Sequence, residues 1–195
     1  MMNSMERWCA DDARLIASGT LAEARALVAG YSSSDPHQAA ERERILAFID
    51  EHPNALERSC LRGHLTASAL IIDASGERAL LTHHRKLDRW LQMGGHVDGD
   101  GNLVGAAWRE ATEESGIEGL SIDPRPVDLD IHTIPARGDE PEHWHLDVRF
   151  QVYAPEGARE EISEESIALG WFTPAEFDAL DSDESVARLF RLAFG

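Results

Sequence analysis

The chain has few cysteines and no long apolar run, and both absences exclude classes of protein. Its 195 residues include only two cysteines, Cys9 and Cys60, too few for the disulfide framework of a small secreted protein. No segment approaches the roughly 20 consecutive apolar residues of a membrane helix. The first residues also lack the basic start and apolar core of a signal peptide. We therefore expect a reduced, cytoplasmic setting and no membrane partner.

Positive charge is also scarce. Lys and Arg number 18 against 36 Asp and Glu, which gives a formal net charge of −18. Binding of a nucleic acid polymer normally needs a basic surface, so the composition argues against such a partner. A small anionic substrate stays compatible with this charge if a metal ion supplies local positive charge.

The most informative stretch runs from Gly94 to Ile117. It begins glycine-rich, and residues 102–115 contain no proline and many good helix formers. Gly116 follows at the point where a helix often ends on a left-handed residue. The stretch therefore predicts a glycine-rich loop followed by one helix.

Three carboxylates share one face of this predicted helix. Glu110, Glu113 and Glu114 stand at positions i, i+3 and i+4, one turn apart. They repel one another unless a cation lies between them, and Arg109 points about 100° away round the helix. Oxygen ligands of this kind suit Mg²⁺ or Mn²⁺. The alternative is a solvated acidic helix face.

The loop, the Arg-Glu pair and the closing glycine together resemble the Nudix box. That motif runs Gly, five residues, Glu, seven residues, then Arg-Glu-apolar-any-Glu-Glu-any-Gly-apolar. Here the motif begins at Gly95, and Gly101 stands where the first glutamate belongs. The later positions all match: Arg109, Glu110, Ala111, Glu113, Glu114, Gly116 and Ile117.

The resemblance implies a metal-dependent hydrolase. It would cleave a diphosphate linkage in a nucleoside diphosphate derivative or related small molecule, through attack of a metal-activated water on phosphorus. The implied cofactor is Mg²⁺ or Mn²⁺, and the implied metal ligands are Gly95, Glu110, Glu113 and Glu114. Glu113, Glu114 and Arg109 are also expected to act in catalysis, with Arg109 orienting a carboxylate. Since Gly101 cannot be that carboxylate, Asp98 or Asp100 is expected to replace it.

The general base in this family comes either from the box or from a later loop. Four glutamates precede a predicted strand at residues 168–172, namely Glu160, Glu161, Glu164 and Glu165. Glu165 is the first choice for the base. An exposed acidic loop is the alternative interpretation.

Seven of the nine histidines lie between His64 and His145. His143 and His145 are two residues apart on a predicted strand, so both face the same side. With His96 in the box loop and Arg85 in the polar segment 84–89, they form the predicted substrate-binding set. Two such histidines could also bind a transition metal, but the sequence shows no fixed third partner. A structural role is the other alternative.

The periodicity after residue 64 predicts a mixed α/β domain. Strands are expected at 65–73 and 78–83, joined as a hairpin, and at 127–134, 143–153 and 168–172. Helices are expected to start at Pro174 and near Ser185. The resemblance implies a Nudix-type α/β/α sandwich with a central mixed sheet over 59–195. Residues 1–58 are expected to form a helical extension packed on it, with a homodimer contact or a lid as alternatives.

Other functions compete with the hydrolase. Gly101 keeps open a catalytically impaired Nudix-fold module that binds or regulates. A histidine-based metalloenzyme would retain Zn or Fe on purification. The isomerase branch of the fold needs a catalytic cysteine in the cleft, and Cys60 precedes the first core strand, so this branch ranks last.

Overall fold

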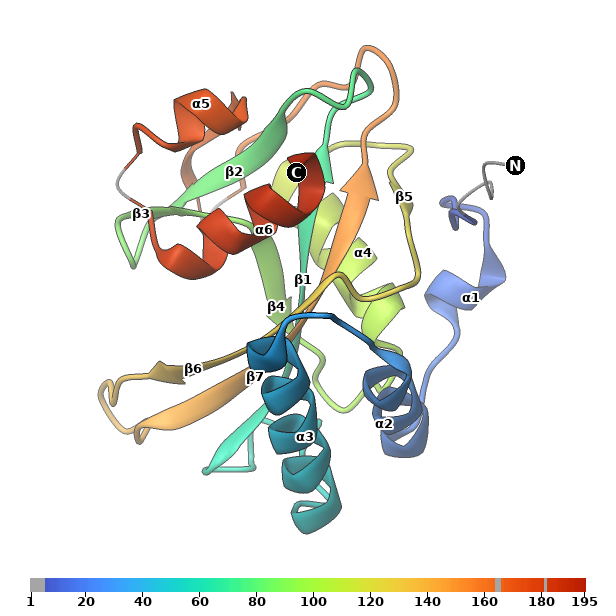
Figure 1. Cartoon of the computed structure of the whole chain (residues 1–195), viewed down its shortest axis with the longest axis vertical. Coiled ribbons are helices and arrows are strands. Elements are labelled where there is room, and N and C mark those ends of the chain that lie inside the picture. Colours follow the sequence, from blue (N-terminus) through green and yellow to red (C-terminus); the bar gives the residue numbers. More distant parts are fainter. Residues whose placement is uncertain (1–5, 164–165, 181) are drawn as a thin grey trace.

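The computed structural model describes residues 6–163, 166–180 and 182–195. These residues form one mixed sheet with helices on both faces (Figure 1). The strands are β1 (Gly63–Ile72), β2 (Ala79–His84), β3 (Arg89–Leu91), β4 (Met93–His96), β5 (Ser121–Ile122), β6 (Asp128–Ile134), β7 (His143–Tyr153) and β8 (Ser166–Phe172). The helices are α1 (Ala13–Ile16), α2 (Leu21–Gly30), α3 (Pro36–Glu51), α4 (Leu103–Ser115), α5 (Pro174–Phe177) and α6 (Glu184–Phe194).

Strands β1 and β7 form the parallel centre of the sheet. Strand β1 also pairs antiparallel with β2 and β4, while β7 pairs antiparallel with β5 and β6. In the β1–β7 register His64 lies opposite His145, and Thr66 lies opposite Asp147. Paired residues point to the same side of a sheet. These four polar side chains therefore share one face.

The opposite face carries the larger hydrophobic core. Leu65, Ala67 and Ile71 of β1 are fully buried there with Ala107 and Ala111 of α4. A smaller core lies on the first face, where Leu70 and Leu81 pack with Phe177, Val186 and Phe190 of α5 and α6. Figure 1 shows α6 crossing the sheet on the side away from α4. The predicted three-layer α/β/α architecture is confirmed.

Helix α4 forms where the sequence predicts it. The Asn102 side chain accepts a hydrogen bond from the Gly105 N–H at 3.1 Å and caps the N-terminus. Gly116 ends the helix in the left-handed region, at φ 67°. Here the absence of a Cβ makes that conformation inexpensive.

The N-terminal helices pack on the sheet rather than standing apart from it. Val28 of α2 and Ile45 of α3 are fully buried in the same core as β1 and α4. Gln38 of α3 donates to the Leu129 carbonyl and accepts from the Leu129 N–H, both at 2.9 Å. This agrees with a packed helical extension, while its boundary at residue 58 stays a prediction. Among the described residues, no helix combines the length and apolarity needed to cross a membrane.

Candidate functional site

A polar cleft of about 380 Å³ opens on the sheet beside α4. Its wall takes residues from β1, β4, β6, β7 and α4, and from the segment after β2. Five of the residues predicted from the sequence line it: Gly95, His96, Glu110, Glu114 and His145. Segments far apart in the chain therefore supply one site.

Two of the predicted metal ligands face the cleft from α4. Glu110 and Glu114 are one helical turn apart, and both line the cleft with Gly95. A Cβ at Gly95 would lie only 2.5 Å from Oε2 of Glu110, so a larger residue there would push this carboxylate out of its present position. Two carboxylates beside the backbone of Gly95 offer oxygen donors, which fit Mg²⁺ or Mn²⁺.

The third box glutamate lies differently. Glu113 is exposed, and it does not belong to the residues that line the cleft. The i, i+3, i+4 spacing predicts that the three glutamates share one helix face. Glu113, however, lies at the edge of that face and is exposed to solvent. The structure thus separates Glu113 from the pair that the cleft brings together.

Arg109 links the box loop to the helix. Its Nη2 donates to Oε1 of Glu110 at 2.9 Å and to the His96 carbonyl at 3.2 Å. The two aspartates expected to replace the missing glutamate have other partners. Asp98 pairs with Arg58 at 2.7 Å, which lowers the pKa of its carboxyl, and Asp100 accepts from the Gly19 N–H at 2.7 Å.

Gly101 has a packing reason to be glycine. Its N–H donates to the Gly19 carbonyl at 2.9 Å. A Cβ there would lie 2.0 Å from the carbonyl oxygen of Thr20, which precedes α2. Real Cβ atoms essentially never come so close to backbone, so the N-terminal extension occupies the space that a box glutamate would need.

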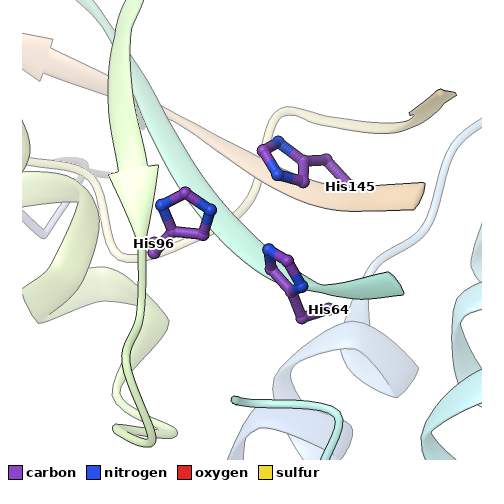
Figure 2. Close-up of side chains that lie close together, drawn as sticks. All are labelled: His64, His96 and His145. Atoms are coloured by element: carbon purple, nitrogen blue, oxygen red, sulfur yellow. The ribbon is translucent and has the colours of Figure 1, made fainter. Parts of the chain in front are cut away.

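Three histidines from three strands converge at the cleft (Figure 2). The ring centroids of His64 and His96 are 4.9 Å apart, those of His64 and His145 are 4.9 Å apart, and those of His96 and His145 are 5.0 Å apart. The sequence showed no third partner for the pair His143 and His145, whereas the structure groups His145 with His64 and His96. Strands β1 and β4 supply two further imidazoles through pairings that the sequence does not reveal.

These histidines are held neutral. Burial lowers the pKa of His64 to about 4, helped by the neighbouring His96 and His143. Burial, with His132 next in effect, lowers the pKa of His145 to about 2. Burial also lowers the pKa of His96. At neutral pH the cluster thus presents imidazoles rather than imidazolium cations.

Two residues of the predicted substrate-binding set lie outside the cleft lining. His143 is buried, and its Nδ1 donates to the Pro141 carbonyl at 2.8 Å. Arg85 points to the start of β8, where its Nη2 donates to the Ser166 carbonyl at 2.9 Å. Glu165, the predicted general base, lies outside the described residues, as does Glu164.

Several cleft residues were not predicted from the sequence. Arg58, His84 and Lys86 bring basic groups to the cleft, and His132 reaches it from β6. Thr66 and Ser68 donate to the buried carboxylate of Asp147 at 3.0 and 2.7 Å. Asp147 is two residues from His145 on β7 and therefore lies on the same face of the sheet. No pattern in the sequence marks Arg58, which precedes β1 in an irregular segment.

Comparison with known proteins gives a family and a fold. The NUDIX domain model matches residues 62–192. No curated protein matches the chain.

Three solved structures illustrate the likeness. A NUDIX-family hydrolase from Clostridium perfringens is 22% identical, with 67% of this chain and 95% of that chain covered and a TM-score of 0.50. A possible asymmetric diadenosine tetraphosphate hydrolase from Jonesia denitrificans is 17% identical over 66% and 91%, with a TM-score of 0.53. The dihydroneopterin triphosphate pyrophosphohydrolase of E. coli is 18% identical over 67% and 93%, with a TM-score of 0.50. At these identities the likeness shows the fold.

Proposed function

The chain belongs to the Nudix family, and from this premise we propose that it hydrolyses a phosphoanhydride bond in a nucleoside diphosphate derivative, with Mg²⁺ or Mn²⁺ as cofactor. The observation that carries the proposal is the convergence of Glu110 and Glu114 with Gly95 in one polar cleft. A binding module has no need for this set of oxygen donors.

Glu110, Glu114 and the Gly95 carbonyl would hold the cation. When bound, the cation supplies positive charge to the phosphoryl oxygens and makes water a better nucleophile. Arg109 keeps the Glu110 carboxylate in place through the 2.9 Å ion pair and ties it to the box loop. Its role is to position a ligand rather than to react.

Basic residues of the cleft suit an anionic substrate. Arg58 and Lys86 line it together with the two acids, so a diphosphate lying in the cleft would meet cations as well as carboxylates. The chain as a whole is strongly acidic, with a net charge of −18. Local basic groups are therefore needed to favour entry of a polyanion.

We propose Glu165, which immediately precedes β8 in the sequence, as the general base. Proton removal from the attacking water needs a carboxylate that does not itself bind the cation. Replacement of Glu165 by Gln should lower kcat and remove the acid limb of the pH–rate profile. An unchanged profile would indicate that a glutamate of the box, such as Glu113, is the general base.

The proposal is tested by turnover of a phosphoanhydride panel. The panel contains nucleoside triphosphates, dinucleoside polyphosphates and nucleoside diphosphate sugars, since fold neighbours are named for hydrolysis of diadenosine tetraphosphate and dihydroneopterin triphosphate. Products are identified by ³¹P NMR with Mg²⁺, with Mn²⁺ and with chelator. We expect turnover of at least one class that stops in chelator.

The competing function is a Nudix-fold module that binds without turnover. It would be favoured if panel members bound in calorimetry and none was hydrolysed. Saturable Mn²⁺ binding that Glu114→Gln removes would still point to an enzyme whose substrate lies outside the panel. If the protein neither bound the cation nor hydrolysed any panel member, the proposed hydrolase function would be wrong.

A further inference from the structure

His64, His96 and His145 bring three imidazoles to one point from three strands of the sheet. His64 lies on β1, His96 ends β4, and His145 lies on β7 directly opposite His64. One ring nitrogen of each lies within 4.8 Å of a nitrogen of the other two. Figure 2 shows the three rings turned toward a common space rather than away from one another.

Three ring nitrogens of this cluster lack hydrogen-bond partners among the described residues. His64 is 2% exposed, yet neither of its nitrogens makes a hydrogen bond to any described residue. The buried Nε2 of His145 is likewise unpartnered within that part of the chain. A buried polar atom left unpaired is destabilising by about 1–3 kcal/mol, so several such atoms side by side favour a ligand that binds them.

We propose that His64, His96 and His145 form a binding site for Zn²⁺ or a chemically similar transition-metal ion. Imidazole nitrogen is a ligand of choice for such ions, and three histidines with one open position form a well-known zinc coordination set. This site differs in chemistry from the oxygen donors at Glu110 and Glu114, which suit hard cations. It therefore goes beyond the proposed hydrolase activity.

The three rings must move together slightly to hold the ion. Zn–N bonds are about 2.0–2.1 Å long, so two nitrogens on one tetrahedral zinc are about 3.4 Å apart. The observed limit is 4.8 Å. Rotations about the side-chain torsions of His96 and His145, which are half-buried at the cleft, can close the difference without moving β1.

The surroundings support a metal site. The Nδ1 of His132 on β6 is 2.9 Å from Oδ2 of Asp130, and the His132 ring lies 5.4 Å from that of His145. Asp130 is held in turn by Arg149 and Arg188. A carboxylate on one ring nitrogen fixes the orientation of metal-ligating histidines, and His132, bound in this way to Asp130, stands beside the cluster as a pre-oriented imidazole.

The open coordination position faces the cleft. His96 and His145 line the cleft while His64 lies behind them. Water or an oxygen atom of a bound substrate can therefore complete the tetrahedron. The ion would also join β1, β4 and β7 where β4 ends.

Zinc titration of the metal-stripped full-length protein tests the site. Calorimetry is run in excess Mg²⁺, so that hard-cation sites are filled, on the wild type and on His96→Gln and His145→Gln. The matched histidine control is His37→Gln, since His37 is exposed on α3 and far from the cluster in the chain. Glu114→Gln controls for zinc binding at the acidic pair, and Co²⁺ in place of Zn²⁺ reports four-coordinate geometry by its visible absorption.

We expect the wild type, His37→Gln and Glu114→Gln to bind one equivalent of Zn²⁺. His96→Gln and His145→Gln should bind it at least about tenfold more weakly and lose the four-coordinate Co²⁺ spectrum. Circular dichroism shows whether the two histidine variants are folded. If His145→Gln unfolds, His96→Gln decides whether the site binds zinc, because His96 is only half-buried. Equal zinc affinity in the His96 variant and the wild type, zinc binding lost only in Glu114→Gln, or no binding by the wild type would each overturn the site.

Discussion

At the residue scale, Gly101 shows how a motif can lose a member for a packing reason. The carbonyl oxygen of Thr20 and the backbone of Gly19 fill the space beside it. The missing glutamate therefore reflects the docking of the N-terminal extension on the box loop. The acids that line the cleft are untouched by this change.

Gly101→Ala should destabilise the protein by about 1–3 kcal/mol, the usual range for overpacking. The added Cβ would meet the Thr20 oxygen, so either α2 or the box loop must shift. Denaturant unfolding measures the loss. Gly30→Ala is the matched control, since a Cβ there meets nothing within 4 Å and should leave stability unchanged or slightly higher. Equal effects of the two changes would contradict the packing explanation.

His64 and His145 should make the metal-free protein sensitive to mild acid. Their folded-state pKa values, about 4 and about 2, lie below the ordinary 6.5. The unfolded chain therefore binds more protons than the folded chain below pH 6.5, and the free energy of unfolding falls as pH drops from there. This stability is fully present above pH 6.5 and is lost progressively toward the folded-state pKa values.

Between pH 7 and pH 5 the free energy of unfolding should fall by a total on the order of 2 kcal/mol. This figure is discounted because solvent reaches the open side of the cleft. The fall is measured by denaturant unfolding in chelator. In this window carboxylates contribute little because their ordinary pKa values are lower. In a His64→Gln variant the free energy of unfolding should fall less between pH 7 and pH 5. A fall as large as in the wild type would contradict the explanation.

At the element scale, α6 is fixed to the sheet by two arginines and two aspartates. Arg188 donates to Asp128 and Asp130 at 2.8–2.9 Å. Arg149 of β7, 1% exposed, contacts the same two carboxylates. Since Asp128 is fully buried, its charge needs both partners.

Arg188→Leu should therefore destabilise the protein by about 3 kcal/mol, because it leaves buried carboxylate charge poorly compensated. Arg191→Leu on the same helix is the control. Arg191 is 61% exposed and pairs with an exposed Glu184, so its loss should change stability by less than about 1 kcal/mol. Thermal unfolding of the two variants gives the comparison. A larger effect at Arg191 would contradict this view of α6.

Sequence patterns predicted some elements and not others for physical reasons. Helix α4 has a capping residue, a run of good helix formers and a closing glycine, so its two ends could be predicted to within one residue. Strands β3 and β4 have three and four residues, too short for alternation to show. Their pairings with β2 and β1 depend on contacts distant in the chain.

The same limit applies to the site. The acids of α4 are local in sequence, so the spacing and the Nudix resemblance identified them. The histidine cluster is assembled by register, with His64 opposite His145 and His96 opposite Thr66. A single sequence does not give strand order, and so it offered His145 no third partner.

At the scale of the whole molecule, the N-terminal helices and the sheet share one core. Ile45 of α3 is fully buried in the cluster that includes β1 and α4, whereas Ile16 of α1 is 79% exposed. The extension therefore stabilises the domain that carries the cleft. We expect the chain to unfold as one cooperative unit.

Ile45→Ala should destabilise the entire protein by about 2–5 kcal/mol, the range for a large-to-small change in a core. Unfolding followed by tryptophan fluorescence and by circular dichroism should still give coincident transitions. Ile16→Ala, the exposed control, should have an effect near zero. Two separate transitions would show that the extension unfolds on its own.

The central claim is that the oxygen donors facing the cleft hold the catalytic cation. The most direct measurement compares kcat/KM for Mg²⁺-dependent hydrolysis in Glu114→Gln and Glu113→Gln, on whichever panel member the wild type turns over. Glu114 lines the cleft and Glu113 is exposed outside its lining. We predict a loss of at least about 100-fold for Glu114→Gln, equivalent to about 2.7 kcal/mol, and a much smaller loss for Glu113→Gln. Near-wild-type turnover by Glu114→Gln would contradict the claim.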